Sequence, residues 1–178
     1  MHRTTLARCA VMALALLASF AVAAQTRSPQ HWIEYKPAGG RYRVDMPAAP
    51  NATTVPVQVG GGATVPMAEA SAMVDRIVYI ASYVDYPASV TKNAAADVIL
   101  TQVRNGSAAG SSWRDEKKLQ LGRSEGREYT VVQASGNVAV TRIYWVRGRL
   151  YQLVVDGTQG IEKADDTRRF LESFSLVQ

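Results

Sequence analysis

The stretch Gly148–Gly157, "GRLYQLVVDG", decides the fold. Most positions between its two glycines are apolar, namely Leu150, Tyr151, Leu153, Val154 and Val155. A strand with one face in water alternates apolar and polar residues, and this stretch does not. A short continuous apolar run is typical of a strand that is covered on both faces. We therefore expect a central strand here, with other elements packed on each side of its sheet.

Other stretches predict the rest of that sheet. The segment "DRIVYIASYVDYP" at 75–87 is also apolar on both faces, whereas "RYRVDM" at 41–46 alternates like a half-buried strand. We expect three more strands at 113–121, 127–135 and 137–147, and short glycine-containing turns to connect them to 149–156 as an antiparallel meander.

A hairpin is expected around Gly60–Gly62, between β-rich runs on either side. With Gly61 as its pivot, Val57 faces Val65 and Pro56 falls opposite Pro66. A proline provides no donor to the ladder and belongs at a sheet edge or bulge. The facing prolines therefore predict a ribbon at the edge of the sheet that resists pairing with another strand.

Two segments have helical patterns. One is 89–106, with Ser89 or Thr91 as its cap and a face made of Val98, Ile99, Gln102 and Val103. The other is 160–174, with Ile161, Ala164, Arg168 and Leu171 at helical spacing and Phe170 and Phe174 beside them. We predict an α+β fold, an α/β/α sandwich with a central antiparallel sheet and a helix on each face.

The N-terminus has the features of an export signal. Arg3 and Arg8 precede a sixteen-residue apolar run that ends in small residues. We expect a signal peptide over 1–24 with cleavage near Ala24 or one residue earlier, and a periplasmic or secreted protein; an uncleaved anchor is the lesser alternative, because the run is short for a membrane span. Residues 25–40 are predicted to form an N-terminal arm anchored by Trp32 and Tyr35, and 41–178 a single domain.

Composition narrows the function. The formal charge of +5 falls to +3 once Arg3 and Arg8 leave, and the remaining charges are scattered among acids. We therefore expect no nucleic acid among its partners. The chain without its signal has no cysteine and retains His31 as its one histidine. We expect no metal, no cofactor, no stable membrane span after cleavage, and a monomer.

The residues that favour catalysis are few. His31 or a pair among Asp75, Asp85 and Asp156 could in principle serve a hydrolase, but aspartates at strand ends are more often turn formers. We assign no catalytic residue and expect no enzyme.

The candidate binding site is "TRIYWVRGRLY". It combines Arg, Tyr and Trp, the residue types enriched at binding hot spots, around one turn. The tentative partner-binding residues are Arg142, Tyr144, Trp145, Arg147 and Arg149. In the alternative interpretation the aromatic residues, with Tyr151, are core and the arginines are solvated turn charges.

The order of several stretches resembles the PsbP-like family, which includes an extrinsic protein of photosystem II, Ran-binding nuclear proteins and many exported bacterial proteins. These are "YRVDMPAAP" (42–50), "LGRSEGREYTV" (121–131), "GRLYQLVV" (148–155) and "RRFLESFSL" (168–176). The resemblance covers roughly 32–177 and implies an α/β/α sandwich. It also implies that the protein acts as an assembly or interaction factor and not as an enzyme.

We therefore expect an exported, non-catalytic interaction or assembly module of the bacterial cell envelope, which contacts a protein partner through the hairpin at 142–149 or the Gly60–Gly62 ribbon. The alternative is a periplasmic protein that binds a small ligand or a lipid in a cavity between one helix and the sheet.

Overall fold

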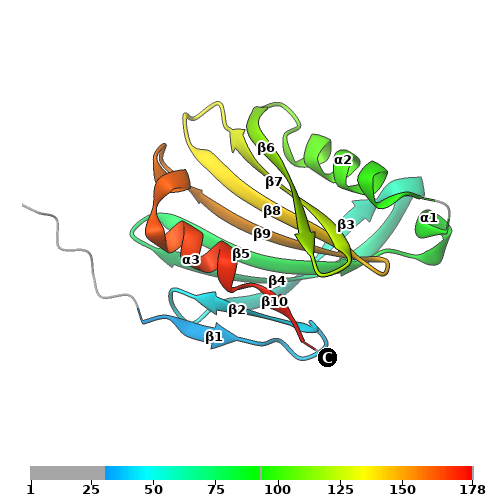
Figure 1. The fold of residues 1–178 in the computed structure, drawn as a ribbon, viewed down its shortest axis with the longest axis horizontal. Helices are drawn as coiled ribbons and strands as arrows, with labels where there is room; N and C mark the ends of the chain where they lie inside the picture. The colour runs from blue at the N-terminus through cyan, green and yellow to red at the C-terminus, as the bar shows by residue number, and fades with distance from the viewer. Residues whose placement is uncertain (1–30, 93, 178) are drawn as a thin grey trace, which may run out of the picture.

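The computed structural model describes residues 31–92 and 94–177 (Figure 1). The predicted signal peptide, residues 1–24, lies outside the described residues. So does the first part of the predicted arm.

A seven-stranded antiparallel sheet forms the centre of the fold. Its order is β3 (Asn51–Val59), β4 (Ala63–Val74), β5 (Ile77–Asp85), β9 (Arg149–Gly157), β8 (Val138–Val146), β7 (Ser124–Val132) and β6 (Ser112–Leu121). The predicted meander and the central antiparallel sheet are therefore confirmed.

Strand β9, the stretch that decides the fold, lies between β5 and β8 in the interior of the sheet. Tyr151, Leu153 and Val155 belong to one hydrophobic cluster. Leu150 is buried in a second cluster, against which Val154 packs. Since successive side chains of a strand point to opposite faces, the two clusters are the two sides of the sheet. The expectation that β9 is covered on both faces is confirmed.

The hairpin β3–β4 has the predicted register. Gly60–Gly62 form a short 3-10 turn (η1), Val57 pairs with Val65, and Pro56 pairs with Pro66. Strand β3 is an outer strand of the sheet, as the two prolines predicted.

A second, three-stranded sheet contains β1 (Ile33–Tyr35), β2 (Tyr42–Met46) and β10 (Ser175–Leu176). The strand predicted at 41–46 therefore exists but lies outside the central sheet, and part of the predicted arm is a strand. The reason is its amphipathic pattern: Tyr42, Val44 and Met46 are buried in the core, while the alternate Arg43 and Asp45 face outward. A strand with one apolar face suits a covering layer better than the middle of a sheet.

The helix predicted over 89–106 is two helices, α1 (Ala88–Thr91) and α2 (Ala96–Ser107). The backbone is extended at Ala95, directly before α2, and this interrupts the predicted helix. The predicted face is partly wrong. Ile99 and Leu100 are buried, whereas Val98 is 49% exposed.

The second predicted helix is also interrupted, by an extended backbone at Ala164. A 3-10 turn, η2 (Ile161–Lys163), precedes α3 (Asp165–Ser173). Phe170 and Leu171 are buried in the first cluster. Arg168, predicted on the apolar face, is exposed and pairs with Asp165 at 2.8 Å.

The two faces of the large sheet have different covers (Figure 1). Helix α2 lies against β7 and β8 on one face. On the other face, α3 and the small sheet share the cover, since Phe170, Tyr42 and Tyr151 belong to one cluster. The α+β class is therefore confirmed. The predicted sandwich, with a helix as the cover of each face, is incomplete, because the small sheet covers one face together with α3. No helix within the described residues is long and apolar enough to cross a membrane.

Candidate functional site

The structure divides the five predicted binding residues between two faces. Arg142 binds Glu128 through Nε, at 2.9 Å, and through Nη2, and it donates from Nη1 to the carbonyl of Leu171 at 2.8 Å. Arg142 therefore connects β7 and β8 to the end of α3. These contacts are internal to the fold.

The two aromatic residues of the set point in opposite directions. Tyr144 is buried and stacks on Phe174, with ring centroids 5.6 Å apart. Trp145 packs edge-on against Tyr86 at 5.1 Å on the other face and is partly exposed.

The two remaining arginines differ sharply. Arg149 is buried; it donates to both carboxylate oxygens of Asp85, at 2.7 and 2.6 Å, and to the carbonyls of Gly39 and Gly40. Arg147, in the turn, is exposed. Partner binding by this set stays a prediction, and Arg147 with part of Trp145 is what the hairpin offers to a partner.

The aspartates considered for catalysis are also placed. Asp85 pairs with Arg149, and Asp156 accepts a hydrogen bond from Gln133. Asp75 has a positive φ of 50° and forms the β4–β5 turn with Arg76. Among the described residues, no group of three or more His, Cys, Asp or Glu is placed to hold a metal ion.

An exposed aromatic side chain lies instead on β6. Trp113 is the most exposed of the described Phe, Trp and Tyr side chains, with 41% of its surface accessible. The guanidinium of Arg104, from α2, lies 4.2 Å from the centre of its ring. We call Trp113 and Arg104 the Trp113 patch. The sequence prediction missed it because no turn or alternation marks Trp113, and its partner is nine residues away on another element.

Charged contacts hold the Trp113 patch in place. Arg104 donates to both carboxylate oxygens of Glu116, at 2.7 and 2.6 Å. The nearly buried Arg127 binds the same carboxylate and also Asp97, at 2.7 Å, and Thr101. Burial raises the pKa of Glu116, but the hydrogen bonds from Arg104 and Arg127 outweigh it and bring that pKa below its usual value. These contacts fasten α2 to β6 and β7.

The other flank of α2 borders a groove. The groove has a volume of about 450 Å³ and lies between α2 and the strands β3, β4, β5 and β9. Its apolar lining includes Val57, Met67, Val84, Ile99, Val103 and Leu150. It continues past Gly60, Ile99 and Gln102 into a hollow of about 340 Å³ beside α1.

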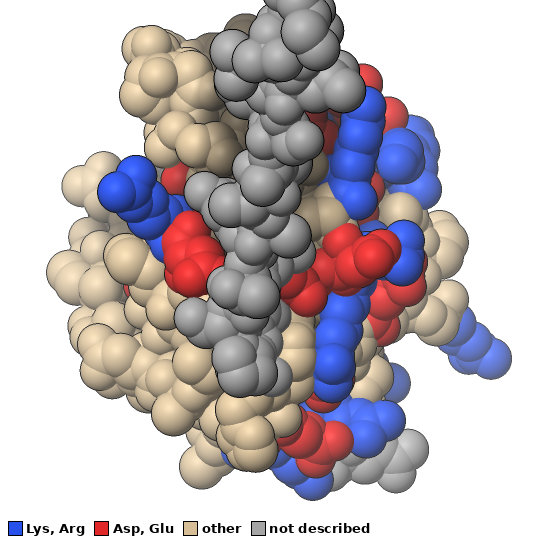
Figure 2. Space-filling view, turned by 90° about the vertical axis from the view of Figure 1, so that its left-hand side faces the viewer, with Lys and Arg blue, Asp and Glu red and all other residues tan. Residues whose placement is uncertain are grey.

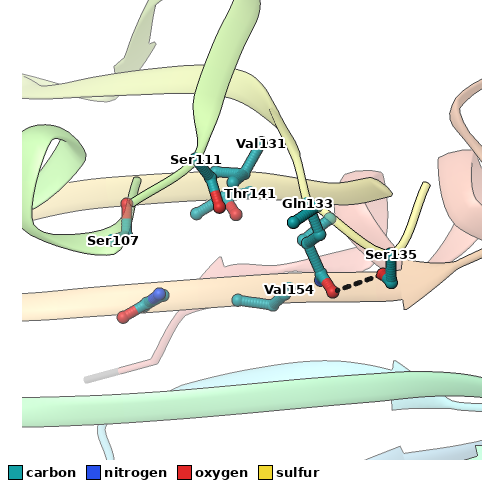
Figure 3. A pocket seen from close by; sticks show the side chains of 10 residues that line it. Ser107, Ser111, Val131, Gln133, Ser135, Thr141 and Val154 are labelled. Atoms are coloured by element: carbon teal, nitrogen blue, oxygen red, sulfur yellow. Dashed lines mark hydrogen bonds between the residues drawn. The ribbon is translucent and has the colours of Figure 1, made fainter. Parts of the chain in front are cut away.

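A third hollow, of about 520 Å³, lies at the C-terminal end of α2 and shares Ser107 and Gln152 with the groove. Figure 3 shows its labelled side chains around one open space, with Ser107 at the helix and Gln133 and Ser135 at the far end. Its lining adds hydroxyl and amide groups from Ser111, Thr141 and Gln133 to apolar Val131 and Val154. We call the three connected hollows the α2 cleft.

No residue that lines the α2 cleft is charged. Elsewhere charges are plentiful: on the face seen in Figure 2, basic and acidic side chains lie next to one another and form no patch of one sign. The cleft is thus uncharged, in contrast to the mixed charges on the face seen in Figure 2.

The fold is similar to folds among the solved structures. No protein-family model and no curated protein matches the sequence. The solution structure of cyanobacterial PsbP (CyanoP) from Synechocystis sp. PCC 6803 matches with a TM-score of 0.52 and 12% sequence identity. The match covers 85% of this chain and 95% of that chain. The chain therefore has a PsbP-like fold, and at this identity the similarity concerns the fold alone.

Proposed function

We propose that this protein is an exported, non-catalytic interaction module of the bacterial cell envelope that binds a protein partner through the Trp113 patch. Its PsbP-like fold and the predicted signal peptide support the class and the location. The observation that carries the proposal is the exposure of Trp113 on a scaffold that holds it still.

Trp113 has the properties of a binding anchor. A large aromatic side chain contributes most when it is already ordered, because little side-chain entropy is then lost on binding. Arg104 provides that order: it lies on the indole ring and is itself held by Glu116. Trp and Arg are also residue types enriched at hot spots. This surface replaces the hairpin 142–149 as the favoured contact, because most of the hairpin residues serve the fold.

The test is native mass spectrometry of the mature protein purified gently from the envelope fraction of its host. We expect a second polypeptide with the wild type and its loss in Trp113→Ala. The matched control is Met73→Ala: Met73 is 69% exposed, on β4, with four strands of the sheet between it and β6. It should retain the partner.

Two results would contradict the proposal. Retention of the partner by Trp113→Ala would move the contact elsewhere, and absence of any partner from the wild type after mild crosslinking would argue against an interaction module. Circular dichroism spectra of each variant should match the wild type, because both side chains lie on the surface.

The second candidate function is binding of a small ligand or lipid, which the α2 cleft favours. Its volumes of about 450 and 520 Å³ lie in the range of small-molecule sites. The same mass spectrum separates the candidates, since a bound small molecule adds a few hundred daltons instead of a polypeptide.

A further inference from the structure

We infer that the α2 cleft binds an uncharged amphiphile, with its apolar chain in the groove between α2 and β3–β5 and its neutral polar head in the hollow beside Ser107. The inference rests on the second candidate function and names its ligand class. It follows from the division of the cleft into an apolar part and a polar part, and from the absence of charge in both.

The groove suits an apolar chain. Val57, Met67, Val84 and Leu150 form its floor on four adjacent strands, and Ile99 and Val103 of α2 form its wall. These side chains leave a volume of about 450 Å³ open beside the helix. An alkyl chain there would remove apolar surface from water on both molecules, which is the main source of affinity for such ligands.

The hollow suits a head that both donates and accepts hydrogen bonds. Hydroxyl groups of Ser111 and Thr141 and the amides of Gln133 and Gln152 line it. Within the described residues, no hydrogen bond occupies the side-chain amide of Gln152, which borders both the hollow and the groove. A neutral hydroxyl, amide or ester group can exchange its bonds to water for bonds to these groups at small cost.

A charged head fits poorly because no residue that lines the cleft is charged, and the Asp156 carboxylate beside it already accepts a hydrogen bond from Gln133. Removing a charge from water without a partner of opposite sign is costly. The charged residues of α2, Asp97 and Arg104, face β6 and β7 and are paired there with Arg127 and Glu116. They are therefore on the opposite flank of the helix from the groove.

The experiment compares three amphiphiles with one decyl chain: decyl maltoside, decyl sulfate and decyltrimethylammonium. Each is titrated below its micelle concentration into the mature protein, with displacement of N-phenyl-1-naphthylamine as the readout. We expect decyl maltoside to bind at least tenfold more tightly than either charged compound. Equal or tighter binding of a charged compound would overturn the ligand class while leaving the ligand-binding function standing. No binding by any of the three would overturn both.

Two variants locate the site. Gln152→Glu puts a carboxylate where the groove meets the hollow, and Gln102→Glu puts one where the groove meets the hollow beside α1. Each should weaken decyl maltoside binding about tenfold. Gln120→Glu is the matched control, because Gln120 is exposed on β6 and lies outside the cleft. It should bind like the wild type.

Gln102 is exposed on its helix, so its variant tests the site even if Gln152→Glu does not fold. Unchanged affinity in Gln102→Glu and in a folded Gln152→Glu would place the ligand elsewhere and overturn the inference.

Discussion

At the scale of single residues, Arg147 and Arg149 lie on one hairpin and have different roles. Arg149 makes four hydrogen bonds to Asp85, Gly39 and Gly40, and its guanidinium lies 4.4 Å from the centre of the Tyr83 ring. It thereby joins the turn before β2 to the central sheet. Arg147 is in the exposed turn, with φ of 50°.

Replacing Arg149 by lysine should therefore destabilise the fold. Lysine keeps the charge but loses the forked geometry, so we expect the free energy of unfolding to fall by about 2 kcal/mol, the worth of a hydrogen bond between charged groups. Urea unfolding followed by circular dichroism measures it. The control Arg147→Lys should stay within about 0.5 kcal/mol of the wild type. Similar losses in both variants would contradict this role for Arg149.

The Arg149–Asp85 pair also predicts a pH dependence. The hydrogen bond from Arg149 holds the pKa of the Asp85 carboxyl below its usual value. A depressed folded-state pKa stabilises the fold above the pKa of an unfolded aspartate, about 3.9, and that stabilisation is lost as the pH falls through the lower folded value.

We accordingly expect the free energy of unfolding to fall less steeply below about pH 4 in Asp85→Asn than in the wild type. Urea unfolding between neutral pH and strongly acidic pH measures the slope. Asp75→Asn is the control: Asp75 forms a turn with positive φ, which asparagine tolerates, so this variant should keep the wild-type slope. An Asp85→Asn slope equal to the wild-type slope would refute the expectation.

At the scale of elements, the outer strands β3 and β6 are protected in different ways. Strand β6 carries a run of charged residues and an irregular register between Arg114 and Lys117. Strand β3 has no charged residue and has Pro56 in its middle. Neither Pro56 nor Pro66 has a backbone N–H to donate, so their pair belongs at a non-hydrogen-bonded position of the β3–β4 ladder. At such a position the backbone nitrogen of Pro56 faces away from β4, toward the open edge of the sheet.

Pro56 is thus expected to prevent strand addition to β3. Pro56→Thr restores a donor on an uncharged edge and should make the protein self-associate, which raises its sedimentation coefficient as concentration increases. Gln58→Thr changes the same strand and keeps the proline, so it should sediment like the wild type. Concentration-independent sedimentation of Pro56→Thr would show that the proline has no such role.

The elements also show where sequence patterns succeed. The strands of the meander and the register of β3–β4 were predictable because alternation, continuous apolar runs and glycine turns are local features. The buried faces of the helices were less predictable from the sequence. Leu100, not Val98, points into the core, because the packing of α2 on β7 and β8 sets its rotation.

At the scale of the whole molecule, the small sheet and the large sheet share one core. Phe174 contacts the rings of Tyr42 from β2 and of Tyr144 and Tyr151 from the large sheet. Trp32, next to β1, lies edge-on to Tyr79 of β5 at 6.2 Å and against Arg169 of α3. Both ends of the domain are therefore built into this core.

The two sheets should unfold together. In a Trp113→Phe/Trp145→Phe background, Trp32 is the one remaining tryptophan, and its fluorescence reports the small sheet. We expect its urea midpoint to coincide with that of far-UV circular dichroism, which reports mainly the large sheet. Phe174→Ala should lower both urea midpoints together, because it reduces the free energy of unfolding by about 3–5 kcal/mol. A separate, earlier transition of Trp32 would contradict a shared core.

The sequence by itself determined the α+β class, the central position of β9 and the edge position of the β3–β4 ribbon, because these follow from side-chain periodicity and from proline chemistry within a few residues. It also led to the PsbP-like fold, which the structural similarity supports. Only the tertiary structure decided which arginines are internal, that Trp113 is exposed beside Arg104, and that an uncharged cleft borders α2. These depend on contacts between residues far apart in the chain, where the angle and position of one element on another decide what is buried.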